Sequence, residues 1–144
     1  MALTVREATV GDMRDVLEYM EDYHRDSNLQ DIPFKRTSAL KIVEYLIAAK
    51  DSVALVAYEE GKLRGILLGT LEPFFFNQDC SYATDIMFIS DGAGPQLWKR
   101  FVEWAQFFGV KRIMMGVSSG NARAGQLLEA LGMTNTGGMY VLRS

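Results

Sequence analysis

The stretch "SVALVAYEEGKLRGILLGTLE", residues 52–72, constrains the fold more than any other part of this sequence. Two runs rich in β-branched and aliphatic residues lie on either side of Glu60 and Gly61. Such a pair of runs around a short turn is typical of a β-hairpin. The stretch therefore predicts two adjacent antiparallel strands, around which the other elements must be arranged.

The segments before the hairpin predict a strand and two helices. Residues 3–8 alternate apolar and polar side chains, as a half-buried strand does. Thr9 is placed to cap a following helix, and Thr37 or Ser38 to cap a second one. The apolar residues of the first helix are Met13, Val16, Leu17 and Met20, and those of the second are Leu40, Ile42, Val43, Tyr45, Leu46 and Ile47.

The segments after the hairpin alternate strands with helices. We expect strands at residues 81–89, 110–117 and 139–144, and helices at residues 95–108 and 121–131. The resulting order is β-α-α-β-β-β-α-β-α-β. A helix between two strands generally implies a parallel crossover, whereas the hairpin is antiparallel. The sequence therefore predicts an α/β (α+β) fold with a mixed, mostly antiparallel central sheet flanked by helices.

Composition narrows the class of protein. A chain of 144 residues with 49% hydrophobic and 23% charged residues fits one globular domain spanning residues 1–144. The net charge of −3 gives no general attraction to nucleic acid or anionic membranes. A lone Cys80 and a lone His24 argue against internal disulfides and zinc, so we expect no metal. Because the chain shows no apolar signal core or membrane span, we expect a cytoplasmic protein.

The loop "ISDGAGPQLW", residues 89–98, is the first stretch with a chemical implication. An apolar strand ends, glycines follow, and Pro95 suits the first position of a helix. Backbone amides at such a helix start, together with the helix dipole, form an anion site. By itself the pattern is equally consistent with a tight turn, so the loop leaves both interpretations open.

The region from Asp85 to Leu131 resembles the GNAT N-acetyltransferase superfamily, as does the predicted order of elements. Gly92 and Gly94 match the two glycines of the family's Arg/Gln-x-x-Gly-x-Gly/Ala loop, which holds the pyrophosphate of acetyl-CoA. The stretch "NARAGQLLEALGM" is similar to the family's Asn-led helix, and Gly65 stands at the usual glycine of its first hairpin. Within the superfamily, the sequence resembles small GNAT proteins encoded by phage genomes.

The resemblance implies acetyl-CoA as co-substrate. Its expected contacts are Phe88, Ile89, Gly92, Ala93, Gly94, Gln96, Asn121 and Arg123. The sequence departs from the family pattern in three ways. The loop between Ile89 and Gly92 is shorter than usual, with Ile89 where counting back places the family's Arg or Gln. Asp91 adds a negative charge beside the expected phosphates and Pro95 removes one donor, and Leu128 replaces a frequent catalytic tyrosine.

Three residues are candidates for proton transfer. Asp85 lies on a strand that lines the substrate cleft in the family, as a general base or amine ligand, or else as a solvated strand residue. If Ile86 and Phe88 share one face of the sheet, Asp85 faces the other with Met87. His24 is either a base near the acceptor site or an exposed helix-terminal residue. Tyr140 is either a substitute acid or a packing residue.

The resemblance thus implies an acetyltransferase that moves the acetyl group of acetyl-CoA directly to a primary amine of a small molecule or peptide. The alternative is a non-catalytic GNAT-fold binding or assembly protein with a degenerate CoA loop. Nucleic acid and membranes are not expected partners. The three aromatic residues of "PFFFNQ", residues 73–78, are assigned to an acceptor pocket, a homodimer contact or a cover for the sheet end.

Overall fold

The computed structural model describes residues 2–117 and 122–143, which form one five-stranded sheet with helices on both faces. The strands are β1 (Leu3–Glu7), β2 (Ser52–Glu59), β3 (Lys62–Phe74), β4 (Asn77–Ser90) and β5 (Arg112–Met114). The helices are a 3-10 turn η1 (Val10–Asp12), α1 (Met13–Arg25), α2 (Arg36–Ala48), α3 (Gly94–Phe107) and α4 (Ala122–Ala130). No helix in the described ranges has both the length and the apolarity needed to cross a bilayer.

The strands lie in sequence order, β1-β2-β3-β4-β5. The first three neighbouring pairs are antiparallel, and β4 pairs with β5 in parallel. The crossover through α3 is therefore parallel, as predicted. The connection from β1 to β2 is not a parallel crossover. Two successive helices, α1 and α2, return the chain to the end of the sheet at which β1 finishes, so β2 runs antiparallel to β1. The mixed, mostly antiparallel fold class is confirmed.

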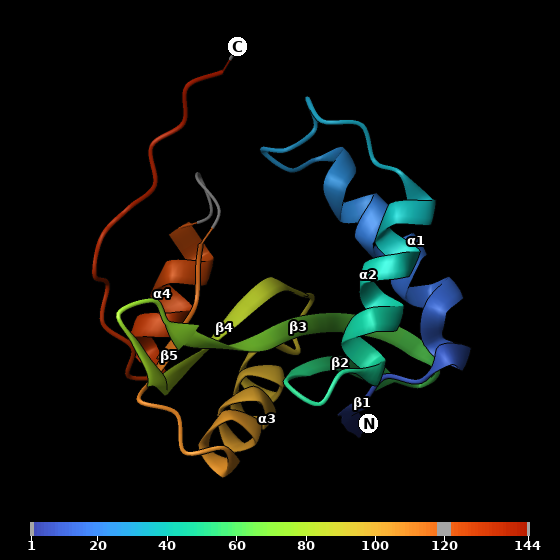
Figure 1. The fold of residues 1–144 in the computed structure, drawn as a ribbon. Helices are drawn as coiled ribbons and strands as arrows, with labels where there is room; N and C mark the ends of the chain where they lie inside the picture. Colours follow the sequence, from blue (N-terminus) through green and yellow to red (C-terminus); the bar gives the residue numbers. More distant parts are fainter. Residues whose placement is uncertain (1, 118–121, 144) are drawn as a thin grey trace.

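Two hydrophobic clusters hold the helices against opposite faces of the sheet (Figure 1). On one face, α1 and α2 pack side by side and bury the four apolar residues predicted for the first helix. On the other face, α3 buries Leu97, Phe101 and Ala105 against β2 and β3. In α2 the predicted apolar face was too wide, because two of the residues assigned to it, Ile42 and Tyr45, are exposed.

Both hairpins close through tight turns. Glu60 and Gly61 have φ values of 52° and 78°, the left-handed pair that a two-residue hairpin turn requires, so the first hairpin is confirmed. The second turn joins β3 to β4 at Phe75 and Phe76, whose side chains are 90% and 73% exposed. These two rings project from the tip of a hairpin and do not cover the sheet.

Several bounds differ from the prediction. Strands were predicted at residues 81–89 and 110–117, whereas β4 spans Asn77–Ser90 and β5 only Arg112–Met114. The second helix begins at Arg36, so Thr37 and Ser38 lie inside its first turn and do not cap it. The final strand expected at residues 139–144 is also wrong for the described part, because residues 133–143 carry no helix or strand. A strand needs a partner ladder, and β5, the strand at that edge of the sheet, is three residues long.

Asp12 fastens the start of α1 to the sheet. Its carboxylate accepts hydrogen bonds from both terminal nitrogens of Arg6, at 2.8 and 2.9 Å, and from the Thr9 backbone N–H at 2.7 Å. The Tyr58 hydroxyl donates to the same carboxylate at 3.3 Å. These hydrogen bonds, the one from Arg6 foremost, hold the pKa of Asp12 well below its ordinary value.

Candidate functional site

The loop after β4 delivers backbone amides to the start of α3. Gly92 has a φ of 82°, in the left-handed region where glycine carries no steric penalty. The first helical hydrogen bond runs from the Leu97 N–H to the Ala93 carbonyl at 3.1 Å. The amides of Gly94 and Gln96 precede that bond and so have no partner within the helix, while Pro95 has no N–H. The helix start can therefore accept an anion.

Arg64 of β3 restrains this loop. Its Nε donates to the Asp91 carbonyl at 3.0 Å, and its Nη2 lies 3.6 Å from the Asp91 carboxylate. The Nη1 of the same guanidinium forms an ion pair with Glu59 at 2.6 Å. The negative charge of Asp91 is thus partly balanced from within the protein. Sequence reasoning missed Arg64, although the pairing of Gly65 with Ser90 places it beside this loop.

Gly94 brings α4 close to the start of α3. A Cβ on Gly94 would lie 2.8 Å from Leu127 Cδ2 and 3.2 Å from Ser90 Oγ. The close packing of α4 therefore requires glycine at position 94, which is itself buried. The neighbouring Leu128 is 7% exposed, so the position that resembles the family's tyrosine is filled by a buried aliphatic side chain.

A β-bulge sets the direction of Asp85. Asp85 pairs with Gly69 and Met87 pairs with Leu68, which leaves Ile86 as the extra residue. A Cβ at Gly69 would collide with the ring of Phe101, so this pair faces α3. Met87 instead packs with the core under α1 and α2. The expected common face for Asp85 and Met87 is therefore wrong, because the simple alternation took no account of the bulge.

Asp85 stands where β4 and β5 stop pairing. The parallel ladder runs from Tyr82–Arg112 to Thr84–Met114. One residue further, Asp85 Oδ1 accepts the Gly116 backbone N–H at 3.0 Å. Burial is the main cause that raises the pKa of Asp85, and the Gly116 hydrogen bond opposes it. A carboxylate whose pKa is moved toward neutrality is a better proton acceptor than an ordinary aspartate.

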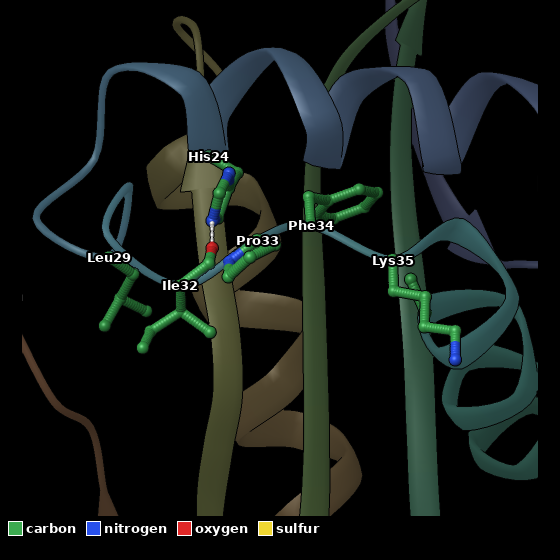
Figure 2. A pocket seen from close by; sticks show the side chains of 7 residues that line it. His24, Leu29, Ile32, Pro33, Phe34 and Lys35 are labelled. Atoms are coloured by element: carbon green, nitrogen blue, oxygen red, sulfur yellow. Dashed lines mark hydrogen bonds between the residues drawn. The ribbon is translucent and has the colours of Figure 1, made fainter.

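His24 and Tyr140 have surroundings different from those of Asp85. His24 Nε2 donates to the Ile32 carbonyl at 2.7 Å, and its ring centroid is 5.5 Å from that of Phe34. It borders a hollow of about 320 Å³ between α1 and α2, also lined by Leu29, Pro33, Lys35 and Ala39 (Figure 2). Tyr140 is 99% exposed. No hydrogen bond joins Asp85, His24 and Tyr140 to one another in the described ranges.

The remaining predicted contacts are distributed around the start of α3. Phe88 packs into the core under α3, whereas Ile89 is 7% exposed and packs under α1 and α2, so its side chain faces away from the loop. Gln96 and Arg123 are exposed on α3 and α4. Asn121 lies outside the described residues. Within these residues, no three His, Cys, Asp or Glu side chains are placed to hold a metal ion.

A comparison with models of known protein families places the chain in one of them. The family model of the acetyltransferase (GNAT) family matches residues 14–133. The chain therefore belongs to the GNAT acetyltransferase family. No curated protein sequence is significantly similar to it.

Solved structures agree with this fold. A transcriptional regulator from Bacillus halodurans C-125 has a TM-score of 0.79 at 23% identity, covering 99% of this chain and 100% of its own. The aminoglycoside N-acetyltransferase AAC(6')-Iy, in complex with the bisubstrate analogue CoA-S-monomethyl-acetylneamine, has a TM-score of 0.79 at 12% identity, covering 100% of this chain and 99% of its own. A ribosomal-protein-alanine N-acetyltransferase from Brucella melitensis biovar Abortus 2308 has a TM-score of 0.74 at 13% identity, covering 100% of both chains.

Proposed function

We propose that this protein is an acetyl-CoA-dependent N-acetyltransferase that acts on a primary amine of a small molecule or peptide. The observation that carries the proposal is the start of α3. There, Gly92 at positive φ and the amides of Gly94 and Gln96 form an anion site in a chain of the acetyltransferase family. The similarity to a structure in complex with a CoA-containing analogue supports the same assignment.

The residues at the loop fit the pyrophosphate of acetyl-CoA. The phosphate oxygens would accept from the amides of Gly94 and Gln96, and the glycines allow close approach to the backbone. Arg64 reduces the repulsion from Asp91 only in part, because its guanidinium lies 3.6 Å from the Asp91 carboxylate and is shared with Glu59. Arg123 on α4 is exposed and available for further phosphate contacts.

Direct transfer requires the acceptor amine to be neutral when it attacks. Its nitrogen forms a bond to the thioester carbonyl carbon, the carbon–sulfur bond breaks, and the thiolate of CoA leaves. We assign Asp85 as the base that removes the amine proton, directly or through water, because burial raises its pKa. Leu128 has no proton to donate, so water protonates the thiolate.

Calorimetric titration with acetyl-CoA, paired with two glycine variants, tests the cofactor site. Gly92→Ala and Gly61→Ala each place a side chain at a similar positive φ, 82° and 78°, at a cost of about 1–2 kcal/mol. Only Gly92 lies in the α3 loop. We expect wild type and Gly61→Ala to bind equally, and Gly92→Ala to bind at least about tenfold more weakly. Equal affinity of all three proteins would contradict the assignment of the loop.

A second function, binding without catalysis, is favoured by the buried Leu128 at the position of the family's tyrosine. The two functions differ in turnover, not in acetyl-CoA binding. Release of the CoA thiol can be followed with a panel of primary amines that includes polyamines, aminoglycosides and peptide N termini. Release above the rate of spontaneous hydrolysis with any acceptor supports the enzyme. Tight acetyl-CoA binding with no release across the panel supports the binding protein.

A further inference from the structure

The loop that follows β4 carries little positive charge of its own. Residues 89–96 contain no lysine or arginine, and the Asp91 side chain, 75% exposed, adds a negative charge. Pro95 lacks an N–H, and the dipole of a helix start amounts to only about half a positive charge. The diphosphate of a coenzyme A thioester carries one negative charge on each phosphate. A binding site for it therefore needs a cation from another part of the chain.

A β-bulge places Arg64 of β3 beside this loop. Leu63 and Gly65 oppose successive residues of β2, which leaves Arg64 as the extra residue. The Arg64 carbonyl accepts from the Asp91 N–H at 2.7 Å and from the Tyr19 hydroxyl at 3.1 Å. The main chain of Arg64 is thus fixed to the loop by one hydrogen bond and to α1 by the other.

The three nitrogens of the Arg64 guanidinium differ in how firmly they are held. Nη1 donates to the Glu59 carboxylate at 2.6 Å, and Nε donates to the Asp91 carbonyl at 3.0 Å. Nη2 lies 3.6 Å from the Asp91 carboxylate, which is too far for a good hydrogen bond. A Cβ built on Gly92 would lie 3.4 Å from this same Nη2. The least restrained nitrogen therefore lies next to the glycine at which the loop turns.

We propose that Arg64 is a ligand of the acetyl-CoA pyrophosphate, and that its Nη2 donates to a phosphate oxygen bound at Gly92. This inference rests on the proposed function and adds a residue of β3 to its cofactor site. Glu59 and the Asp91 carbonyl hold the guanidinium in place before the ligand arrives, so little side-chain freedom is lost on binding. The exposed Asp91 carboxylate turns to water, and a phosphate takes its position at Nη2.

Calorimetric titration with acetyl-CoA and with 3′-dephospho-acetyl-CoA tests the role of Arg64. Arg64→Gln should weaken the binding of both ligands at least about tenfold and by the same factor, because both keep the pyrophosphate. Arg100→Gln is the matched control. Arg100 is likewise a partly exposed arginine in an ion pair, with Glu7 at 3.8 Å, and its loss should leave both affinities unchanged. Weaker binding of acetyl-CoA alone would place Arg64 at the 3′-phosphate and overturn the proposal.

Two further variants separate a phosphate ligand from a residue that only holds the loop. Glu59→Gln breaks the same ion pair but keeps the guanidinium, so it should bind acetyl-CoA at least as tightly as wild type does. Arg64→Lys keeps a charge near Gly92 and should recover at least about threefold of the affinity that Arg64→Gln loses. If Glu59→Gln binds as weakly as Arg64→Gln, or if lysine recovers nothing, Arg64 acts through the loop alone and the proposal is wrong.

The wild-type titration separates this inference from the proposed function. A wild type that does not bind acetyl-CoA would contradict both together. A wild type that binds acetyl-CoA with the same affinity as Arg64→Gln would leave the proposed function standing and overturn only the role of Arg64. Circular dichroism checks that each variant is folded, and Arg64→Met, which keeps an aliphatic stem, replaces Arg64→Gln if the glutamine variant does not fold.

Discussion

Two aspartates in this fold have opposite surroundings. Asp12 is 6% exposed, yet its carboxylate accepts from Arg6, Thr9 and Tyr58, and these hydrogen bonds lower its pKa. Among residues 2–117 and 122–143, the one residue outside Asp85 that donates to the Asp85 carboxylate is Gly116, through its backbone N–H, and burial raises the Asp85 pKa. The first carboxylate is surrounded by donors, whereas the second is half-buried and accepts from one other residue of the described part of the chain.

The difference fits a structural role for Asp12 and the proposed role of Asp85 as the base. Full hydrogen bonding stabilises the charged form of Asp12, so that residue joins β1, α1 and β2 and has little tendency to take up a proton. Asp85 keeps acceptor capacity, at the point where the β4–β5 ladder ends. The two carboxylates differ in the main cause of their pKa shifts: hydrogen bonds, from Arg6 foremost, lower the pKa of Asp12, whereas burial, opposed by the Gly116 N–H, raises the pKa of Asp85.

The largest effect is expected on catalysis at Asp85. Asp85→Asn keeps the shape of the side chain and an oxygen for the Gly116 N–H, but removes the proton acceptor. We expect the rate of CoA thiol release with a saturating amine to fall about 10²–10⁴-fold. Calorimetry should give an unchanged affinity for acetyl-CoA, and thermal unfolding an unchanged or higher stability. An unchanged rate between pH 6 and 9 would exclude Asp85 as the base.

The next effect is on stability at Asp12. Asp12→Ala leaves Arg6 and the Thr9 N–H without their acceptor. We expect the free energy of unfolding to fall by about 2–3 kcal/mol, less than for a fully buried pair because the Arg6 side chain is 44% exposed and can turn to water. Urea unfolding measures the change. A loss below about 0.5 kcal/mol, the range of ordinary surface substitutions, would mean that the network does not hold the fold.

The pH dependence of stability should differ in sign at the two aspartates. The lowered pKa of Asp12 stabilises the fold above the unfolded value of about 3.9, and that contribution is lost as pH falls below it. The raised pKa of Asp85 imposes no penalty below about 3.9 and a growing one as pH rises through its folded value. Relative to wild type, Asp12→Asn should lose most at neutral pH, whereas Asp85→Asn should gain most there. Urea unfolding from pH 3 to 8 compares them, and parallel curves would contradict the contrast.

The smallest effect is expected at His24. It lies at the end of α1, on the same side of the sheet as Asp12, and ties the following loop through Ile32. His24→Gln retains a donor of similar reach, so we expect a loss of stability below about 1 kcal/mol and an unchanged rate of thiol release. A rate loss as large as that of Asp85→Asn would indicate that His24, and not Asp85, is the base.

The sequence predicted the repeating elements better than the local irregularities. The first hairpin, the apolar residues of α1 and the glycine-led start of α3 follow from periodicity and turn chemistry, and all are present. The direction of Asp85 did not follow, because one extra residue at Ile86 reverses the alternation of β4. The role of Arg64 required the β3–β4 register. The final strand was overpredicted because an apolar run indicates the tendency to pair and does not supply the partner.

Carboxyl carbon NMR of the free protein tests the central contrast most directly. With ¹³C-labelled aspartate, the two resonances are assigned by Asp12→Asn and Asp85→Asn and followed as the pH is lowered. We expect the pKa of Asp85 to lie above about 3.9, the ordinary aspartate value, and Asp12 to remain ionised well below that pH. If Asp85 titrates at or below the ordinary value, or together with Asp12, the two carboxylates are not distinguished by their surroundings and the assignment of Asp85 as the base fails.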